Sequence, residues 1–288
     1  MQEKFLTIFT PTYNRAYILP KLYESLLRQS NKNFVWLVGD DGSSDKTKDL
    51  VQQFQAEGKL EIIYFFQENK GKHFAVNKGL ESTVTEFFSV LDSDDYLADN
   101  AVEEIKKLSY KIQNSNEIAG FTFIRFSEKI NYDKEKYGQK EWISHRKIIY
   151  NWEFPGEMCF CLKTAIHQRF LFPEFEGEKF CAESLVLRRI EREYKFLCTD
   201  KVLAFGDYLN DGLSSNFYKL LLNNPKGSLL NIKERFKDQL TKAEKDELAK
   251  TYWDIASKTK QDFKEKFFGI SPFLILNVLF NKFRNKVR

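Results

Sequence analysis

The sequence predicts an α/β fold, with a mostly parallel sheet flanked by helices and a helical extension at the C-terminus. Two observations support this. Short runs rich in β-branched and aromatic residues alternate with apolar residues at helical spacing from Lys4 to Phe126. After about residue 219 the composition shifts to helices rich in Lys and Glu. Regular alternation of strand and helix is typical of βαβ units, which build parallel sheets covered on both faces.

The individual elements follow in order along the chain. Strands are predicted at 4–10, 34–40, 60–66, 86–92 and 120–126, and helices between them at 18–27, 50–54, 75–80 and 101–108. A later strand, "MCFCL", places Cys159 and Cys161 on one face, where small apolar side chains are expected to be buried. We therefore expect two domains, a sheet domain over 1–218 and a helical extension over 219–288.

Composition excludes several classes of protein. The net charge is only +4 over 288 residues, with acidic and basic residues interspersed, so no nucleic-acid partner is expected. Four cysteines without CxxC spacing and three distant histidines predict neither a zinc site nor a disulfide framework. The N-terminus enters a strand without the pattern of a signal peptide, which predicts a cytoplasmic protein.

Polar motifs follow each of the first four strands. They read "TPTYNR", "GDDGSSDKT", "QENKGKHFAVNKGL" and "DSDDY". Ligands of parallel sheets bind beyond the carboxyl ends of the strands. We therefore expect these loops to share one cleft, lined by Tyr13, Arg15, Asp41, Lys72 and the cluster Asp92 to Asp95.

The acidic cluster needs a neutralising partner, because crowded carboxylates raise one another's pKa. An EF-hand does not fit, since Tyr96 and Leu97 occupy positions that require Asp or Asn and Gly. No P-loop and no GxGxxG fingerprint follows a strand. A hard cation, Mn²⁺ or Mg²⁺, held by one or two carboxylates and by the diphosphate of a nucleotide fits better.

Together these motifs resemble the family 2 glycosyltransferases with the GT-A fold, a Rossmann-like nucleotide-binding fold. The resemblance is strong over about the first 130 residues and weaker to about residue 215. It implies an inverting, metal-dependent hexosyltransferase that moves a sugar from a UDP-sugar donor to a hydroxyl of a glycan or lipid-linked acceptor. Bacterial-type surface polysaccharide synthesis is the implied setting.

The resemblance also implies roles for single residues. Tyr13 would border or stack on the base, Asp41 would bind uracil, and Lys72 would face the diphosphate. Asp94 would bind the metal, with Asp92 reaching the ribose side and the metal, and Asp95 the metal or the donor sugar. The implied nucleotide-binding set is Pro11, Thr12, Tyr13, Arg15, Asp41, Lys72, Asp92 and Ser93.

Inverting transfer also needs a general base for the acceptor hydroxyl. Aligning the family pattern "EDYDLWLRL" with "AESLVLRRI" places Glu183 at the catalytic position, with Glu178 as the alternative. The chain departs from the pattern twice, with Ala182 for the first acid and Glu for Asp. A purely structural role for Glu183 at the start of a helix is the other interpretation.

The sequence also bears on two alternative functions. A sugar nucleotidyltransferase is disfavoured because no Gly-rich loop follows the first strand. A non-catalytic nucleotide-sugar or glycan-binding subunit of a polysaccharide assembly complex is supported by the unusual Ala182-Glu183 pair.

Trp142, Trp152 and Phe154 are candidates for stacking on sugars or for the core. The loop 208–216 resembles a family loop that closes over the donor.

The C-terminal segment 271–288 predicts an amphipathic basic helix that is too short to span a bilayer. Such a helix can lie peripherally on the inner leaflet of the membrane. Packing on the catalytic domain or on a second subunit is the alternative, so the oligomeric state stays open.

Overall fold

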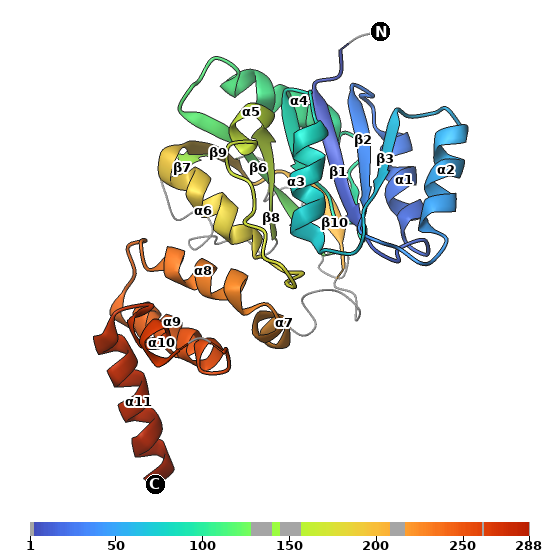
Figure 1. Ribbon diagram of the computed structural model, residues 1–288. Coiled ribbons are helices and arrows are strands. Elements are labelled where there is room, and N and C mark those ends of the chain that lie inside the picture. Colours follow the sequence, from blue (N-terminus) through green and yellow to red (C-terminus); the bar gives the residue numbers. More distant parts are fainter. Residues whose placement is uncertain (1–2, 128–139, 145–156, 208–216, 261, 288) are drawn as a thin grey trace. The chain divides into compact units, whose positions relative to one another are not determined.

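The fold is taken from a computed structural model (Figure 1). It describes residues 3–127, 140–144, 157–207, 217–260 and 262–287. The chain divides into two compact units. We call Met1–Phe172 with Val186–Gly212 the sheet unit, and Pro173–Leu185 with Leu213–Arg288 the helical unit. The sequence predicted a boundary at 218/219, with Pro173–Leu185 in the first domain. In the structure, these residues cluster with the C-terminal helices.

One sheet organises the sheet unit, with the strand order β3-β2-β1-β4-β8-β6-β10-β5, and with β9 beside β6 and β7 beside β9. The strands are β1 (Leu6–Thr12), β2 (Phe34–Asp40), β3 (Ile62–Phe66), β4 (Phe87–Val90), β5 (Asp95–Leu97), β6 (Ile118–Phe126), β7 (Glu141–Ser144), β8 (Glu157–Lys163), β9 (Lys195–Thr199) and β10 (Val202–Gly206). Strand β1 pairs in parallel with both β2 and β4, and β2 with β3. Strand β8 runs antiparallel to β4 and β6. The order therefore reverses beside β1, which makes a topological switch point.

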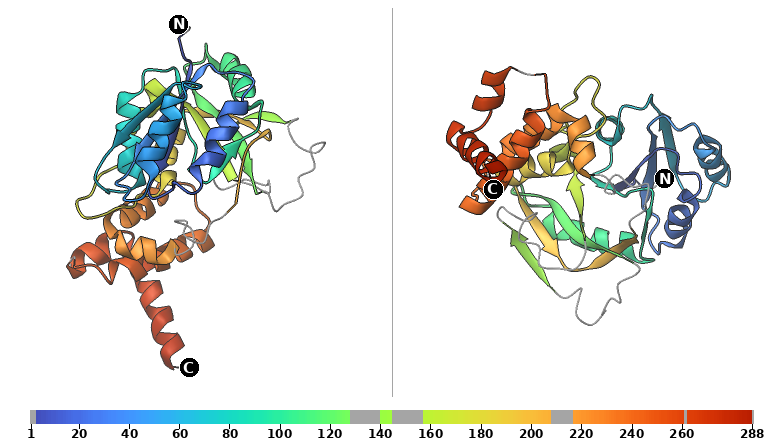
Figure 2. Two further views of the ribbon diagram at one scale, coloured as in Figure 1. Left: turned by 90° about the vertical axis from the view of Figure 1, so that its right-hand side faces the viewer. Right: turned by 90° about the horizontal axis from the view of Figure 1, so that it is seen from below.

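Helices cover both faces of this sheet, as two further views also show (Figure 2). Helices α1 (Leu19–Arg28), α2 (Thr47–Ala56) and α4 (Ala101–Ile112) share one apolar core with Ile8 and Trp36. Helix α3 (Lys72–Ser82) contacts β1 and β2, where Phe9 packs against Gly79. Consecutive residues of a strand face opposite sides, so Ile8 and Phe9 anchor opposite layers. The predicted α/β class is confirmed.

Helices α5 (Thr164–His167) and α6 (Glu183–Glu193) belong to the connections that follow β8. His167 of α5 packs edge-on against Phe88. Burial lowers the pKa of His167 to about 4, which keeps its ring neutral. Helix α6 leads into β9.

The helical unit has its own apolar core. Its helices are α7 (Phe217–Asn223), α8 (Pro225–Arg235), α9 (Lys242–Ala256), α10 (Phe263–Phe268) and α11 (Pro272–Val287). Tyr252 and Ile275 are fully buried between α9 and α11. A capping box between Thr241 and Glu244 starts α9. Across the described parts of the chain, every helix is too short or too polar to cross a membrane.

The α3 side of the sheet is packed around one ring. Phe9 stacks on Phe65 and Phe88, with ring centroids 6.2 Å and 5.5 Å away. A Cβ atom at Gly39 would lie 2.7 Å from Phe65 Cζ and 2.8 Å from Phe9 Cε2. These rings cannot move apart without disturbing the layer beneath α3.

Gly39→Ala should therefore lower the free energy of unfolding by about 1–3 kcal/mol through overpacking. The measurement is the urea midpoint of the purified protein, with Val84→Ala as control because Val84 is 94% exposed. Equal midpoints for the two variants would show that the rings accommodate the extra carbon.

Candidate functional site

The four polar loops emerge from the carboxyl ends of β1 to β4. Residues 13–15 follow β1, which ends at Thr12, and Asp92 to Asp95 follow β4, its parallel neighbour. The switch point therefore lies between these two loops, where parallel sheets bind their ligands. The prediction that the polar loops share the carboxyl edge of the sheet is confirmed.

The first two loops hold each other in place. Asn14 has a left-handed backbone with φ of 54°, a conformation that Asn tolerates better than most residues. Its N–H donates to Ser43 Oγ at 2.8 Å, and its Oδ1 accepts from Ser44 N at 2.8 Å. Asp45 Oδ2 accepts from Ala16 N at 3.1 Å. These contacts fix the backbone on both sides of Tyr13, whose ring is 48% exposed. Neither Asn14 nor Asp45 was predicted, although their short polar side chains in loop motifs were a usable signal.

Asp41 shapes the third loop. Its Oδ1 accepts from Gln67 Nε2 at 2.7 Å and from Lys70 N at 2.9 Å, while Oδ2 accepts from Gly71 N at 2.7 Å. Gly71, with φ of 105°, is the N-cap of α3, so this carboxylate sets where α3 and Lys72 begin. The expected contact of Asp41 with uracil stays a prediction.

The acidic cluster is partly neutralised by two cations. Lys72 Nζ lies 2.6 Å from Asp92 Oδ1, and Arg125 Nε lies 2.5 Å from Asp95 Oδ1. Burial, followed by the charge of Asp92, raises the pKa of Asp94. Burial and Asp92 also raise the pKa of Asp95, against the opposing effect of Arg125. The structure thus brings together Lys72 and the predicted acids, and adds Arg125, which sequence analysis missed.

Arg125 and Asp95 form a buried ion pair that is closely packed by its neighbours. Arg125 lies on β6, and Asp95 starts β5, where it pairs with Gly206 of β10. A Cβ atom at Gly206 would overlap Asp95 Oδ1 and lie 2.9 Å from Arg125 Nη2. Arg125 Nη1 also lies 3.6 Å from Glu157. Glycine at 206 therefore leaves the space that the ion pair needs.

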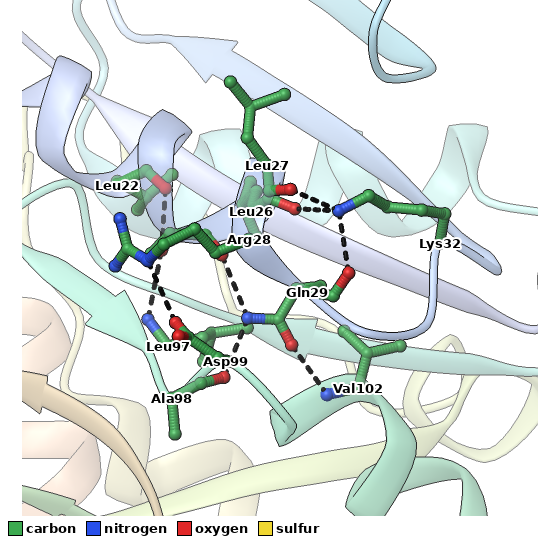
Figure 3. A network of polar contacts seen from close by, with 11 residues as sticks. Leu22, Leu26, Leu27, Arg28, Gln29, Lys32, Leu97, Ala98, Asp99 and Val102 are labelled. Carbon is green, nitrogen blue, oxygen red and sulfur yellow. Dashed lines mark hydrogen bonds and ion pairs between the residues drawn. The ribbon is translucent and has the colours of Figure 1, made fainter.

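Helix α1 anchors the segment that follows the acids (Figure 3). The buried Gln29 donates to Ala98 O at 2.8 Å and accepts from Val102 N at 3.0 Å. Leu97 N donates to Ser25 Oγ at 3.2 Å. The C-terminal carbonyls of α1 are in turn bound by Lys32, a favourable place for a cation. These bonds hold β5 and the start of α4 against α1.

Comparison with known proteins establishes the family. The profile of Glycosyl transferase family 2 matches residues 7–175, more than half of the chain. The chain belongs to glycosyltransferase family 2. This glycosyltransferase is 29% identical over 232 residues to the GalNAc(5)-diNAcBac-PP-undecaprenol beta-1,3-glucosyltransferase of Campylobacter jejuni, covering 75% of this chain and 71% of the relative. An uncharacterized Haemophilus influenzae glycosyltransferase is 32% identical over 114 residues, which is 40% of this chain and 45% of the relative.

Solved structures confirm the GT-A fold of this glycosyltransferase. Staphylococcus aureus TarS 1–349, solved with UDP, superposes with a TM-score of 0.58 at 16% identity, over 88% of this chain and 81% of that one. The Pyrobaculum calidifontis mannosyltransferase PcManGT, solved with GDP-Man and Mn²⁺, gives a TM-score of 0.58 at 14% identity, over 90% of this chain and 74% of that one.

The two candidate bases of the glycosyltransferase lie in the helical unit. Glu183 is exposed and is the first residue of α6, where a helix start was expected. Glu178 is buried, and its carboxylate accepts from Lys226 N at 2.7 Å and Gly227 N at 2.8 Å. These are orphan donors of the first turn of α8. Glu178 therefore caps a helix, whereas the role of Glu183 as base stays a prediction.

The remaining candidates divide between described and undescribed residues. Trp142 lies in β7, paired with Cys198 of β9. Trp152, Phe154 and the loop 208–216 lie outside the described residues. Cys161 is buried and Cys159 half-buried, and both are free thiols.

The donor set of the acidic cluster fits a hard divalent cation. Within the described residues, no three His, Cys, Asp or Glu side chains are grouped closely enough to hold an ion together. Two carboxylates are enough for Mg²⁺ or Mn²⁺ when phosphate oxygens complete the shell. Asp92 and Asp94 offer the carboxylate oxygens, and burial followed by the charge of Asp92 raises the pKa of Asp94, an effect that a nearby cation would oppose.

Arg125→Met should destabilise the glycosyltransferase by up to about 3–5 kcal/mol at alkaline pH, because it leaves the Asp95 carboxylate buried without its counter-charge. The loss should shrink as the pH falls, since Asp95, whose pKa burial already raises to about 7, then takes up a proton. Urea unfolding measures the loss. The double variant Arg125→Met, Asp95→Asn should recover a large part of it, since the stranded charge is gone. Additive losses in the two single variants would contradict a coupled pair.

Proposed function

We propose that this family 2 glycosyltransferase is an inverting, metal-dependent enzyme that moves a hexose from a UDP-sugar to a hydroxyl of a glycan or lipid-linked acceptor. The observation that supports this proposal most is the acidic cluster at the switch point of the sheet, beside the loop that contains Tyr13. Its three carboxylates have two cationic partners, Lys72 and Arg125. TarS has been solved with UDP and with UDP-GlcNAc, and the name of the C. jejuni relative specifies an undecaprenol-linked acceptor. Surface polysaccharide synthesis is the proposed setting.

The base and ribose of the donor are assigned to the first loops. Tyr13 has the exposed ring that a base can stack on, and Pro11, Thr12, Arg15 and Ser93 complete the proposed nucleotide contacts. An ionised carboxylate accepts about four hydrogen bonds. Asp41 accepts three from the loop 67–71, so one acceptor position is left for the N–H of uracil.

The diphosphate is assigned to Lys72 and the cation. Lys72 is the first residue of α3, where helix N–H groups and a side-chain ammonium favour an anion together. Asp94 and Asp92 would hold Mn²⁺ or Mg²⁺. When bound, this ion would neutralise the charge that develops on the departing UDP. Asp95, which pairs with Arg125, is the proposed further contact to the metal or the donor sugar.

Glu183 is the proposed general base. In an in-line displacement, the acceptor oxygen attacks the anomeric carbon as the bond to UDP breaks, and the base takes the acceptor proton. Glu183 is exposed at the start of α6, where an acceptor can approach its side chain. The product would be β-linked if the donor is α-linked.

A non-catalytic donor-binding subunit is the second candidate, favoured by Ala182 in place of an acid. UDP release by the purified protein, measured over a panel of UDP-sugars with and without acceptor, decides between the two. If the acceptor increases the release of UDP from a UDP-sugar, the protein is an enzyme. If the protein binds UDP tightly but frees none from any UDP-sugar, it is a binding subunit.

Asp94→Asn should abolish the Mn²⁺-dependent part of UDP binding and leave the fold intact, because one anionic ligand of the cation is lost. Titration calorimetry with UDP, with and without Mn²⁺, measures this. Asp49→Asn, at an exposed position on α2, is the control and should bind as the unmodified protein does. Unchanged metal dependence in Asp94→Asn would remove Asp94 from the site.

Glu183→Gln should slow sugar transfer by about two to four orders of magnitude, since the amide cannot accept the proton. UDP affinity should hardly change. Glu176→Gln is the matched control, because Glu176 is another exposed acid of the segment before α6. If Glu183→Gln keeps its transfer rate, another group must serve as the base.

A further inference from the structure

Helix α11 carries apolar side chains on two different faces. Ile275 and Val278 lie in the core of the helical unit, where α11 packs against α9. A second row, which we call the exposed stripe, consists of Phe273, Leu276, Phe280 and Phe283. Its spacing of three, four and three residues puts all four on one face of the helix. Their exposed fractions run from 54% to 69%.

A polar border lies along one side of the exposed stripe. Asn277, Asn281 and Arg284 each follow a stripe residue by one position, so they lie next to it around the helix. These three side chains line a groove of the helical unit together with Lys242 and Lys250 of α9. Asp246, Glu247 and Val278 complete the lining. The groove therefore opens beside the stripe, on the side of its polar border.

The segment that carries the exposed stripe is basic in sequence, although Asp246 and Glu247 of α9 also line the groove beside it. After Glu265 the sequence contains no acidic residue, but five basic ones: Lys266, Lys282, Arg284, Lys286 and Arg288. Phe and Leu on one helix face with basic residues beside them are typical of helices that lie in a membrane interface. A second copy of this segment would add the same positive charge, whereas an anionic lipid surface would neutralise it.

We infer that α11 docks in the interface of an anionic membrane, with the exposed stripe at the boundary of the acyl chains and Arg284 at the level of the lipid headgroups. This gives the helical unit a defined lipid-facing side. The inference deepens the proposed function, on which it rests only for the lipid-linked acceptor. Docking itself needs neither donor nor sugar transfer.

The test uses point substitutions, because removing α11 would uncover the core around Ile275. Protein with all 288 residues is sedimented with phosphatidylcholine vesicles, with and without about one-third phosphatidylglycerol. We expect binding to the anionic vesicles only, and weaker binding in high salt, which screens the headgroup charge.

The double variant Phe280→Ser, Phe283→Ser should bind anionic vesicles at least about tenfold more weakly, because apolar area available for insertion is lost. Tyr110→Ser with Ile63→Ser is the matched control. It removes two exposed apolar side chains from the sheet unit and should bind as the unmodified protein does. Arg284→Gln should weaken binding less and reduce its salt dependence.

Three results would overturn the inference. They are equal vesicle binding by the stripe variant and the control, equal binding to neutral and anionic vesicles, and a protein dimer that the stripe variant converts to monomer without any vesicle binding. The last result would make a second copy the occupant. UDP affinity is measured in the same samples, so failure of docking is separated from failure of the proposed function.

Discussion

The site depends on balancing three carboxylates at the end of β4. Arg125 pairs with Asp95, and Lys72 with Asp92, while burial and the neighbouring charge raise the pKa of Asp94. Much of the surrounding structure serves this balance, because buried charge is tolerated only when compensated. β5 pairs with β10 where Gly206 leaves room for the ion pair, and Gln29 holds the chain that follows β5. The divalent cation of the proposed function would supply the missing positive charge.

The loops around this cluster are held together by hydrogen bonds to one another. Asn14 joins the first loop to the second, and Asp41 joins the second to the third, which ends where α3 and Lys72 begin. Parallel strands give these loops a common edge, and side-chain to backbone bonds then fix their shapes. A polar residue in such a motif can therefore position a neighbouring loop and still keep acceptor capacity for a ligand.

The helical unit follows a different logic. Glu178 caps α8, and Asn224 Oδ1, just before α8, accepts from Lys179 N and Phe180 N. This reciprocal bonding explains why 173–185 belongs with the C-terminal helices. The family profile ends at residue 175, close to where this segment begins. The family profile thus covers the loops around the acidic cluster, while α11 and its exposed stripe lie beyond the matched residues.

The sequence by itself determined the elements and the edge of the site. Alternation of strands and helices placed β1 to β4 and α1 to α4 within a few residues, because apolar periodicity is a local property. It missed β5, three residues long, and Arg125, which lies about thirty positions from Asp95 and gives no local signal. Tertiary structure alone decided that Glu178 caps a helix and that the apolar residues of α11 divide between a buried and an exposed face. Such outcomes depend on which distant donors and surfaces meet when the chain packs, and spacing along the sequence does not encode those contacts.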